Sequence, residues 1–193
     1  PVPVLRTRGA VHVDGATWDL DGWTGSQGHN WGAAHAPEYA WGQVVFPGAD
    51  GEPSVLAEGF SGRIALGPVN SPLLSALTVR RGEQAWRFDR LVDRWNHTPQ
   101  IGDLAWTLRM RGPAGEAFLS MQARPERVVC LGYHNPSGPM AHCYNSKLAR
   151  AVLRVQPMND HAFEVETAHG AALELLSLRG DPRFEPVGGP AWG

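Results

Sequence analysis

Residues 104–124 read LAWTLRMRGPAGEAFLSMQAR, and this stretch decides the fold class. On either side of a central GPAG segment, residues 104–111 and 116–124 alternate apolar and polar side chains, which is the period of half-buried β-strands. Glycine and proline between two such runs favour a tight turn. The sequence therefore predicts an antiparallel β-hairpin over residues 104–124.

The rest of the chain repeats this pattern of short strands and turns. Asp14-Gly15 is a strong two-residue hairpin signal between the first two strands. The last two strands are expected to meet in a turn at residues 168–170. The runs that read as strands lie near residues 11–13, 17–20, 39–46, 54–64, 73–80, 84–88, 104–111, 116–124, 128–134, 140–154, 162–167 and 171–178.

Strands with turns at intervals of 8–14 residues, and no amphipathic helix, indicate an all-β, antiparallel, up-and-down fold. Closing such a meander into a lipocalin-like β-barrel removes its two edges, and a barrel of about eight strands holds one small ligand. We therefore expect one lipocalin-like barrel domain over residues 1–180. Residues 181–193, with prolines at 182, 186 and 190, are expected to form an extended tail.

The composition excludes several functional classes. Of 193 residues, 23 are Gly, 16 are Pro and 8 are Trp, whereas 19% are charged and the net charge is −2. Because Lys and Arg are scattered, we expect no nucleic-acid partner. No stretch approaches the roughly 18 apolar residues of a membrane span, so any membrane contact would be peripheral. The chain starts at Pro1 without a signal-peptide pattern, and we predict a cytoplasmic protein whose chain is processed or partial.

The cysteines and histidines do not suggest a metal site. His29 and His35 lie six residues apart on a Gly- and Ala-rich segment that lacks carboxylates at ligand spacing. Cys130 and Cys143 fall on the two arms of one predicted hairpin, where they can form a disulfide or remain free thiols. The chain has no Gly-x-Ser-x-Gly element and no phosphate-binding loop, and we predict no cofactor.

The most informative segment for function is residues 25–32, GSQGHNWG, which is followed by WGQ at residues 41–43. These segments bring an imidazole, amides and two indoles together among glycines that permit close packing. Buried amides and imidazoles need hydrogen-bond partners, and an indole has a large apolar surface with one donor. The cluster is therefore either a polar plug that closes the barrel or the polar end of a pocket for a mostly apolar molecule.

Several motifs resemble one superfamily, that of the tocopherol cyclases, the acyclic carotenoid hydratases (hydroxyneurosporene synthase-like) and their lipocalin-like relatives, including some fungal Diels–Alderases. These motifs are GHNWG at 28–32, YAWGQ at 39–43, YHNP at 133–136 and NSK at 145–147. The resemblance covers roughly residues 20–150. Its members typically contain two lipocalin-like barrels, so the resemblance implies that this chain corresponds to one barrel, either the C-terminal half of such a protein or a single-domain relative. A second lipocalin-like domain or a homodimer partner would then complete the protein.

The resemblance also implies a chemistry without cofactors on a hydrophobic isoprenoid- or polyketide-like substrate. The reaction would be a cyclisation, as in an isomerase, or a hydration, as in a lyase, by acid or pericyclic catalysis inside the barrel. Such chemistry needs an apolar cavity, a proton donor and aromatic faces that stabilise developing positive charge. The indoles of Trp23, Trp31, Trp41 and Trp106 are candidates for those faces.

Glu58 and His29 are the candidate catalytic residues. Glu58 lies between Leu56 and Phe60 on an otherwise apolar strand face, and burial of an inward carboxyl would favour the protonated form that can act as an acid. An ion pair with Arg63 or another arginine at the barrel rim is the alternative. His29 would orient the substrate or shuttle a proton, or it would hold its own loop through backbone hydrogen bonds.

The candidate substrate-binding residues are eight polar or aromatic side chains: Asn30, Trp31, Tyr39, Trp41, Gln43, Tyr133, Asn145 and Lys147. Other roles remain open for several of them. The indoles can fill the core, and Lys147, the only lysine, can extend into solvent. Alternatively, the Lys147 side chain points inward and forms an ion pair with Glu58 or binds a substrate oxygen. The sequence thus leaves three classes of function: an enzyme, a non-catalytic carrier of a hydrophobic small molecule, and a structural half-barrel of a two-domain protein.

Overall fold

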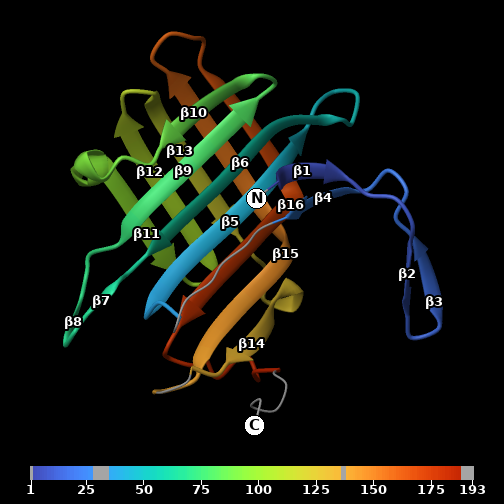
Figure 1. Cartoon of the computed structure of the whole chain (residues 1–193), viewed down its shortest axis with the longest axis vertical. Helices are drawn as coiled ribbons and strands as arrows, with labels where there is room; N and C mark the ends of the chain where they lie inside the picture. Colours follow the sequence, from blue (N-terminus) through green and yellow to red (C-terminus); the bar gives the residue numbers. More distant parts are fainter. Residues whose placement is uncertain (1, 28–34, 136–137, 188–193) are drawn as a thin grey trace. The chain divides into compact units, whose positions relative to one another are not determined.

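The computed structural model of the chain describes residues 2–27, 35–135 and 138–187 (Figure 1). The chain divides into two compact units, Pro1–Ala33 and Ala34–Gly193. The first four strands form small sheets of their own and do not join the main sheet.

Unit 1 consists of two short antiparallel ladders. Strand β1 (Val2–Arg6) pairs with β4 (Thr24–Gln27), and β2 (Ala10–Val13) pairs with β3 (Ala16–Asp19). The turn between β2 and β3 is the predicted Asp14-Gly15 turn, whose residues both have positive φ, at 50° and 79°. Such a turn matches the twist of the strands that it joins, which is why the local sequence identifies it.

Unit 2 is built on one ten-stranded antiparallel sheet. A two-stranded ladder of β7 (Ala65–Leu66) and β8 (Val69–Asn70) lies between β6 and β9 in sequence. The strands of the main sheet are β5 (Glu38–Pro47), β6 (Pro53–Gly62), β9 (Leu74–Arg81), β10 (Gln84–Phe88), β11 (His97–Gly102), β12 (Ala105–Gly112), β13 (Gly115–Gln122), β14 (Val129–Tyr133), β15 (Ala141–Pro157) and β16 (Phe163–Ser177). The predicted all-β, antiparallel class is confirmed.

The strand order is β10-β9-β6-β5-β16-β15-β13-β12-β11, with β14 on the free part of β15. The first and last strands of the unit, β5 and β16, pair with each other, as they do in a closed up-and-down barrel. Within the described strands, however, no ladder joins β10 to β11, so hydrogen bonding does not close the sheet into a barrel. The two are connected by the 3₁₀-helix η1 (Leu91–Asn96), which contacts both β9 and β12 where the edges would have to meet.

The hairpin predicted over residues 104–124 is confirmed as β12 and β13, which pair from Ala105↔Gln122 to Gly112↔Gly115. The predicted hairpin about residues 168–170 is wrong, because Phe163–Ser177 is one continuous strand. Its ladder with β15 shifts register on both sides of Ala149, so residues 168–170 lie at an irregularity within the ladder. Another short 3₁₀-helix, η2 (Pro125–Arg127), leads from β13 towards β14.

The sheet of unit 2 folds over an interior filled by its own side chains. In Figure 1, β5, β6 and β9 cross β11, β12 and β13. Trp106 of β12 lies between these two parts of the sheet: a Cβ atom on Gly59 of β6 would be 2.9 Å from its ring, and one on Gly42 of β5 would be 3.2 Å from it. The largest side chains that are less than 2% exposed are Trp106, Phe46, Leu77, Leu108, Leu119, Met121, Leu153, Leu173 and Leu176.

The two cysteines lie on opposite faces of the sheet as free, buried thiols. The ladder of β14 and β15 places Cys130 opposite Tyr144 and Leu131 opposite Cys143. Successive side chains of a strand point to opposite faces, so this one-residue offset separates the thiols. Cys130 joins the main core, whereas Cys143 belongs to a smaller apolar cluster on the other face.

The predicted C-terminal tail is described as far as Val187. Its backbone follows β14: Val187 N–H donates to the Cys130 carbonyl at 2.8 Å, and Gly132 N–H donates to the Val187 carbonyl at 3.1 Å. Phe184 packs edge-on against Tyr144, with ring centroids 5.6 Å apart. The tail therefore covers part of the edge that β14 would otherwise expose.

Candidate functional site

A group of polar and aromatic side chains gathers on the outward face of the sheet, away from the filled interior. We call it the outward cluster. In β5 the buried residues are Ala40, Gly42, Val44 and Phe46, so strand alternation places the side chains between them on the opposite face. The ladders β5–β16 and β16–β15 then bring matching positions of three strands side by side. The outward cluster comprises Tyr39, Trp41, Glu58, Tyr133, Cys143, Asn145, Lys147 and Glu174.

Glu174 of β16 is the polar centre of the outward cluster. Its Oε1 accepts a hydrogen bond from Asn145 Nδ2 at 2.7 Å and an ion pair from Lys147 Nζ at 3.1 Å. The carboxylate side chain is 22% exposed, whereas that of Lys147 is 63% exposed. Glu174, the less exposed member of the pair, is therefore held by two donors, and the ammonium group of Lys147 lies at the solvent boundary.

Trp41 links this centre to Glu58 on β6. Trp41 Nε1 donates to Glu58 Oε1 at 3.3 Å, and Lys147 Nζ lies 5.6 Å from the centroid of the indole ring, within range of a cation–π interaction. The indole thus has a polar partner at its edge and a cation near its face. The predicted direct pairing of Lys147 with Glu58 is replaced by this arrangement, in which Glu174 holds the lysine.

Glu58 shares the outward face with Leu56 and Phe60, as strand alternation predicted. The face is outward, however, and the interior is lined instead by the intervening residues of β6. The alternative ion pair with Arg63 is not formed, because Arg63 Nε pairs with Glu38 Oε2 at 2.7 Å. Glu58 therefore lies beside an aromatic surface at the outer side of the sheet.

Two phenols converge on the Cys143 thiol. Tyr39 Oη lies 4.0 Å from Cys143 Sγ. Burial raises the pKa of Tyr39 well above its usual range, and the Cys143 and Glu174 groups raise it further. Burial, followed by Cys143, likewise raises the pKa of Tyr133. The pKa of the Cys143 thiol is raised mainly by burial and then by Glu174, although hydrogen bonds with both phenols oppose this change. All three groups are therefore neutral near pH 7.

His35 and Asn135 extend the outward cluster next to Tyr133. The rings of His35 and Tyr133 stack with centroids 4.9 Å apart and planes 21° from parallel. Asn135 Oδ1 accepts a hydrogen bond from the His35 backbone N–H at 3.0 Å and lies 2.9 Å from His35 Nδ1. Asn135 thus fixes the position of the histidine.

The structure brings seven of the predicted site residues to this one face, while the other three fall outside the described residues. Gln43 lies on the same face, opposite Glu58 on β6 and Ala172 on β16. The remaining six in place are Tyr39, Trp41, Glu58, Tyr133, Asn145 and Lys147. The three outside are His29, Asn30 and Trp31.

Sequence reasoning missed Cys143, Glu174 and His35 as members of the site. Glu174 could have been identified from the sequence, because it is the one charged residue in the otherwise apolar run ALELL at residues 172–176. Cys143 shares a face with Asn145 and Lys147 by strand alternation. For His35 no local signal exists, since its partner Asn135 is 100 residues away in the sequence.

Within residues 2–27, 35–135 and 138–187, no group of three or more His, Cys, Asp and Glu side chains is placed to hold a metal ion. In the same part of the chain, no helix has the length and apolar character that crossing a membrane requires.

All three tyrosines of the chain are expected to resist ionisation in the folded protein. Burial raises the pKa of Tyr39, Tyr133 and Tyr144. The folded state therefore binds more protons than the unfolded state above about pH 10, so the tyrosine contribution to stability is complete below pH 10 and declines as the pH rises further. A spectrophotometric pH titration should show little tyrosinate near pH 10–11 until the chain unfolds. Half-ionisation near pH 10 in the native state would contradict the burial of these phenols.

No protein-family model matches the chain. An uncharacterized protein of Mycobacterium tuberculosis, in the strains CDC 1551 / Oshkosh and ATCC 25618 / H37Rv, is 29% identical over 147 residues, which are 76% of this chain and 43% of the relative. The match therefore spans less than half the length of these curated relatives. A crystal structure of an AttH-like protein from Nitrosomonas europaea aligns with a TM-score of 0.37 and 9% identity, over 75% of this chain and 52% of that one.

Proposed function

We propose that the protein is a cofactor-independent enzyme that acts on a hydrophobic isoprenoid- or polyketide-like substrate, and that the substrate lies against the outward cluster. The observation that carries the proposal is the convergence of two neutral phenols, Tyr39 and Tyr133, beside an indole and an ammonium group. This location replaces the predicted one inside the barrel, because the chain's own side chains fill the interior.

The chemistry of the cluster suits a substrate with an apolar body and one oxygen function. Ala141, Leu176 and Leu131 form an apolar floor around Cys143. The phenols can donate hydrogen bonds to a carbonyl or hydroxyl oxygen, and Lys147 can attract its partial negative charge. The faces of Trp41 and Tyr39 would stabilise positive charge that develops on a polyene. The arrangement thus combines an apolar contact surface with donors that fix its orientation.

The raised pKa values favour hydrogen-bond assistance over proton transfer by the phenols. A phenol whose pKa is raised by burial keeps its proton near pH 7 and donates a hydrogen bond without releasing it. Cyclisation by a pericyclic route needs no proton transfer, since the product is an isomer of the substrate. If an acid is required, as in hydration, the candidate is Glu58, whose carboxyl group accepts a hydrogen bond from Trp41.

A bound molecule provides the most direct test. Organic extraction of freshly purified protein, followed by mass spectrometry, is expected to release an apolar molecule in about one-to-one ratio. The double variant Tyr39→Phe/Tyr133→Phe loses two hydrogen bonds to the ligand oxygen. The amount of apolar molecule extracted per chain should therefore fall by at least about tenfold. Tyr144→Phe is the matched control, since Tyr144 belongs to the main core on the other face of β15. Equal retention by the double variant and the control would contradict a site at the outward cluster.

The second candidate function is a non-catalytic carrier, and the neutral state of both phenols and the thiol favours it. Glu58→Gln separates the two functions, because the amide oxygen can still accept the Trp41 hydrogen bond while the group can no longer act as an acid. An enzyme that uses Glu58 should lose turnover by about 10²–10⁴-fold and keep its ligand. Unchanged turnover would exclude the acid role, and absence of turnover in the unaltered protein would identify a carrier.

A further inference from the structure

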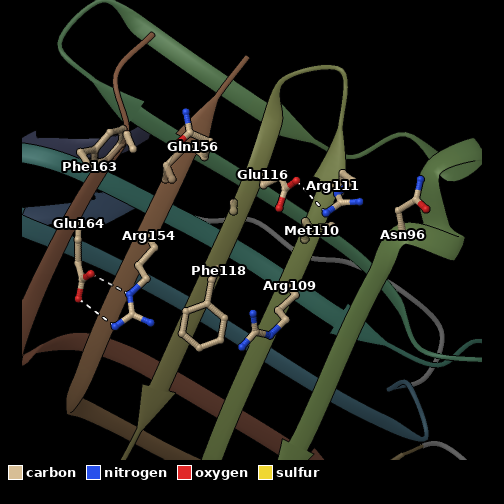
Figure 2. A pocket seen from close by; sticks show the side chains of 13 residues that line it. Asn96, Arg109, Met110, Arg111, Glu116, Phe118, Arg154, Gln156, Phe163 and Glu164 are labelled. Carbon is tan, nitrogen blue, oxygen red and sulfur yellow. Dashed lines mark hydrogen bonds and ion pairs between the residues drawn. The ribbon is translucent and has the colours of Figure 1, made fainter. Parts of the chain in front are cut away.

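A second site lies on the outward face of β12, β13 and β15, and it shares no residue with the outward cluster. Here the structure has a pocket of about 690 Å³, which residues of η1 and β16 complete at its two sides. A volume of this size is within the range of pockets that hold small molecules, about 300–1,000 Å³. Figure 2 shows its charged and aromatic side chains projecting from neighbouring strands into the same space.

The register of the sheet aligns four of these side chains in one row. Arg109 of β12 is opposite Phe118 of β13, Phe118 is opposite Arg154 of β15, and Arg154 is opposite Glu164 of β16. Directly opposite residues on neighbouring antiparallel strands have side chains on the same face, close enough to interact. The order Arg–Phe–Arg–Glu across the row follows from the hydrogen-bond register of the sheet.

Phe118 lies between two guanidinium groups. The central carbon of Arg109 is 4.7 Å from the centroid of the ring, and that of Arg154 is 5.7 Å from it. Figure 2 shows the ring face-on, with one arginine on each side. Phe118 therefore lines the pocket with a guanidinium group within cation–π range on each side of its ring.

Carboxylates neutralise two of the three arginines that line the pocket, and Arg109 remains. Arg154 Nε pairs with Glu164 Oε2 at 2.8 Å, and Arg111 pairs with Glu116 at 2.9 Å. In the described part of the chain, Arg109 has no carboxylate within ion-pair distance. The lining thus has one positive charge in excess, located at an exposed guanidinium next to an aromatic face.

We propose that this pocket binds a small organic carboxylate with a planar apolar body. The guanidinium of Arg109 has a planar fork of N–H donors that matches a carboxylate in a two-bond geometry. The planar body lies over the Phe118 ring, where stacking adds to the affinity. Arg154 remains paired with Glu164 and lies beside the planar body of the ligand. The carboxylate of the ligand therefore forms its ion pair with Arg109 alone.

The test uses 2-naphthoate as the probe and 2-naphthylmethanol as its neutral analogue, titrated into the full chain by calorimetry or followed by ligand NMR. We expect 2-naphthoate to bind with a submillimolar Kd and at least about tenfold more tightly than the alcohol, because the charge-assisted bonds to Arg109 are absent for the alcohol. Equal affinity for the two compounds, or no binding of 2-naphthoate at about 5 mM, would overturn the proposal.

Variants identify the site. Arg109→Gln should weaken 2-naphthoate at least about tenfold and leave the alcohol unchanged, and Phe118→Leu should weaken both compounds. Arg80→Gln is the matched control, because Arg80 is an exposed arginine on the outward face of β9 and has no ion-pair partner in the described part of the chain. Arg109 and Arg80 are both exposed, so neither substitution should impair folding. Weakening by Arg80→Gln equal to that by Arg109→Gln would show general charge attraction and overturn the assignment.

Discussion

Trp106→Ala is expected to lower the free energy of unfolding by about 3–5 kcal/mol, the range for removal of a fully buried large aromatic side chain. The indole is 0% exposed and contacts both parts of the folded sheet at Gly42 and Gly59. Its Nε1 donates to Ser61 Oγ at 3.1 Å. The substitution would leave a cavity between the two parts and would remove a donor from a buried hydroxyl.

Urea denaturation of the full chain, followed by circular dichroism, measures this loss. Trp95→Ala is the matched control, because Trp95 is 78% exposed on η1 and its removal should change the free energy of unfolding by less than about 0.5 kcal/mol. A loss below about 1 kcal/mol for Trp106→Ala would mean that the two parts of the sheet do not pack through this residue.

Gly115→Val is expected to cost about 3 kcal/mol or more in the free energy of unfolding. Gly115 has a φ of +120°, a backbone conformation that a β-branched residue hardly adopts. A Cβ atom there would also lie 2.8 Å from the backbone nitrogen of Met158 and against the Gln156 carbonyl. Because these contacts are backbone atoms of the neighbouring chain segment, they cannot move aside without disturbing the end of β15.

Gly102→Val is the control for this prediction, since a Cβ atom on Gly102 meets nothing within 4 Å and its φ is not positive. The two variants compare the same change of side chain, measured by thermal and urea unfolding. If Gly115→Val unfolded at the same urea concentration as Gly102→Val, the tight β12–β13 turn would not need a glycine at this position.

The sequence predicted the hairpins well because their signals are local. The β12–β13 turn and the Asp14-Gly15 turn are defined by a few adjacent residues. Alternation also grouped Leu56, Glu58 and Phe60 correctly on one face. It did not show which face is interior, because a period of two divides a strand into two faces without saying which one the rest of the chain will cover.

Features that depend on distant parts of the chain were predicted less well. The sequence predicted a turn at Ala168, His169 and Gly170, because these residues resemble one locally, whereas β16 continues through them and pairs with both β15 and β5. Closure of the barrel was inferred from the general instability of sheet edges, and η1 between β10 and β11 was not foreseen.

Most members of the candidate site were named from the sequence, but their arrangement was not. Trp41, Asn145 and Lys147 were identified from motifs, yet Glu174, which holds two of these side chains, was not. Its role arises from the register of the β5–β16 and β15–β16 ladders, which join residues far apart in the sequence. Such register is a property of the whole sheet and leaves no short motif.

The pairing of β5 with β16 has a consequence for how the protein is made. During synthesis, β5 leaves the ribosome early and must wait with one unpaired edge until Phe163–Ser177 has been translated. Pairings between segments so distant form slowly, because a long loop must close before the contacts that stabilise it exist. The outward cluster, which spans both strands, is thus completed at the end of folding, and a chain that stops before Phe163 contains its tyrosines and Trp41 but has no assembled site.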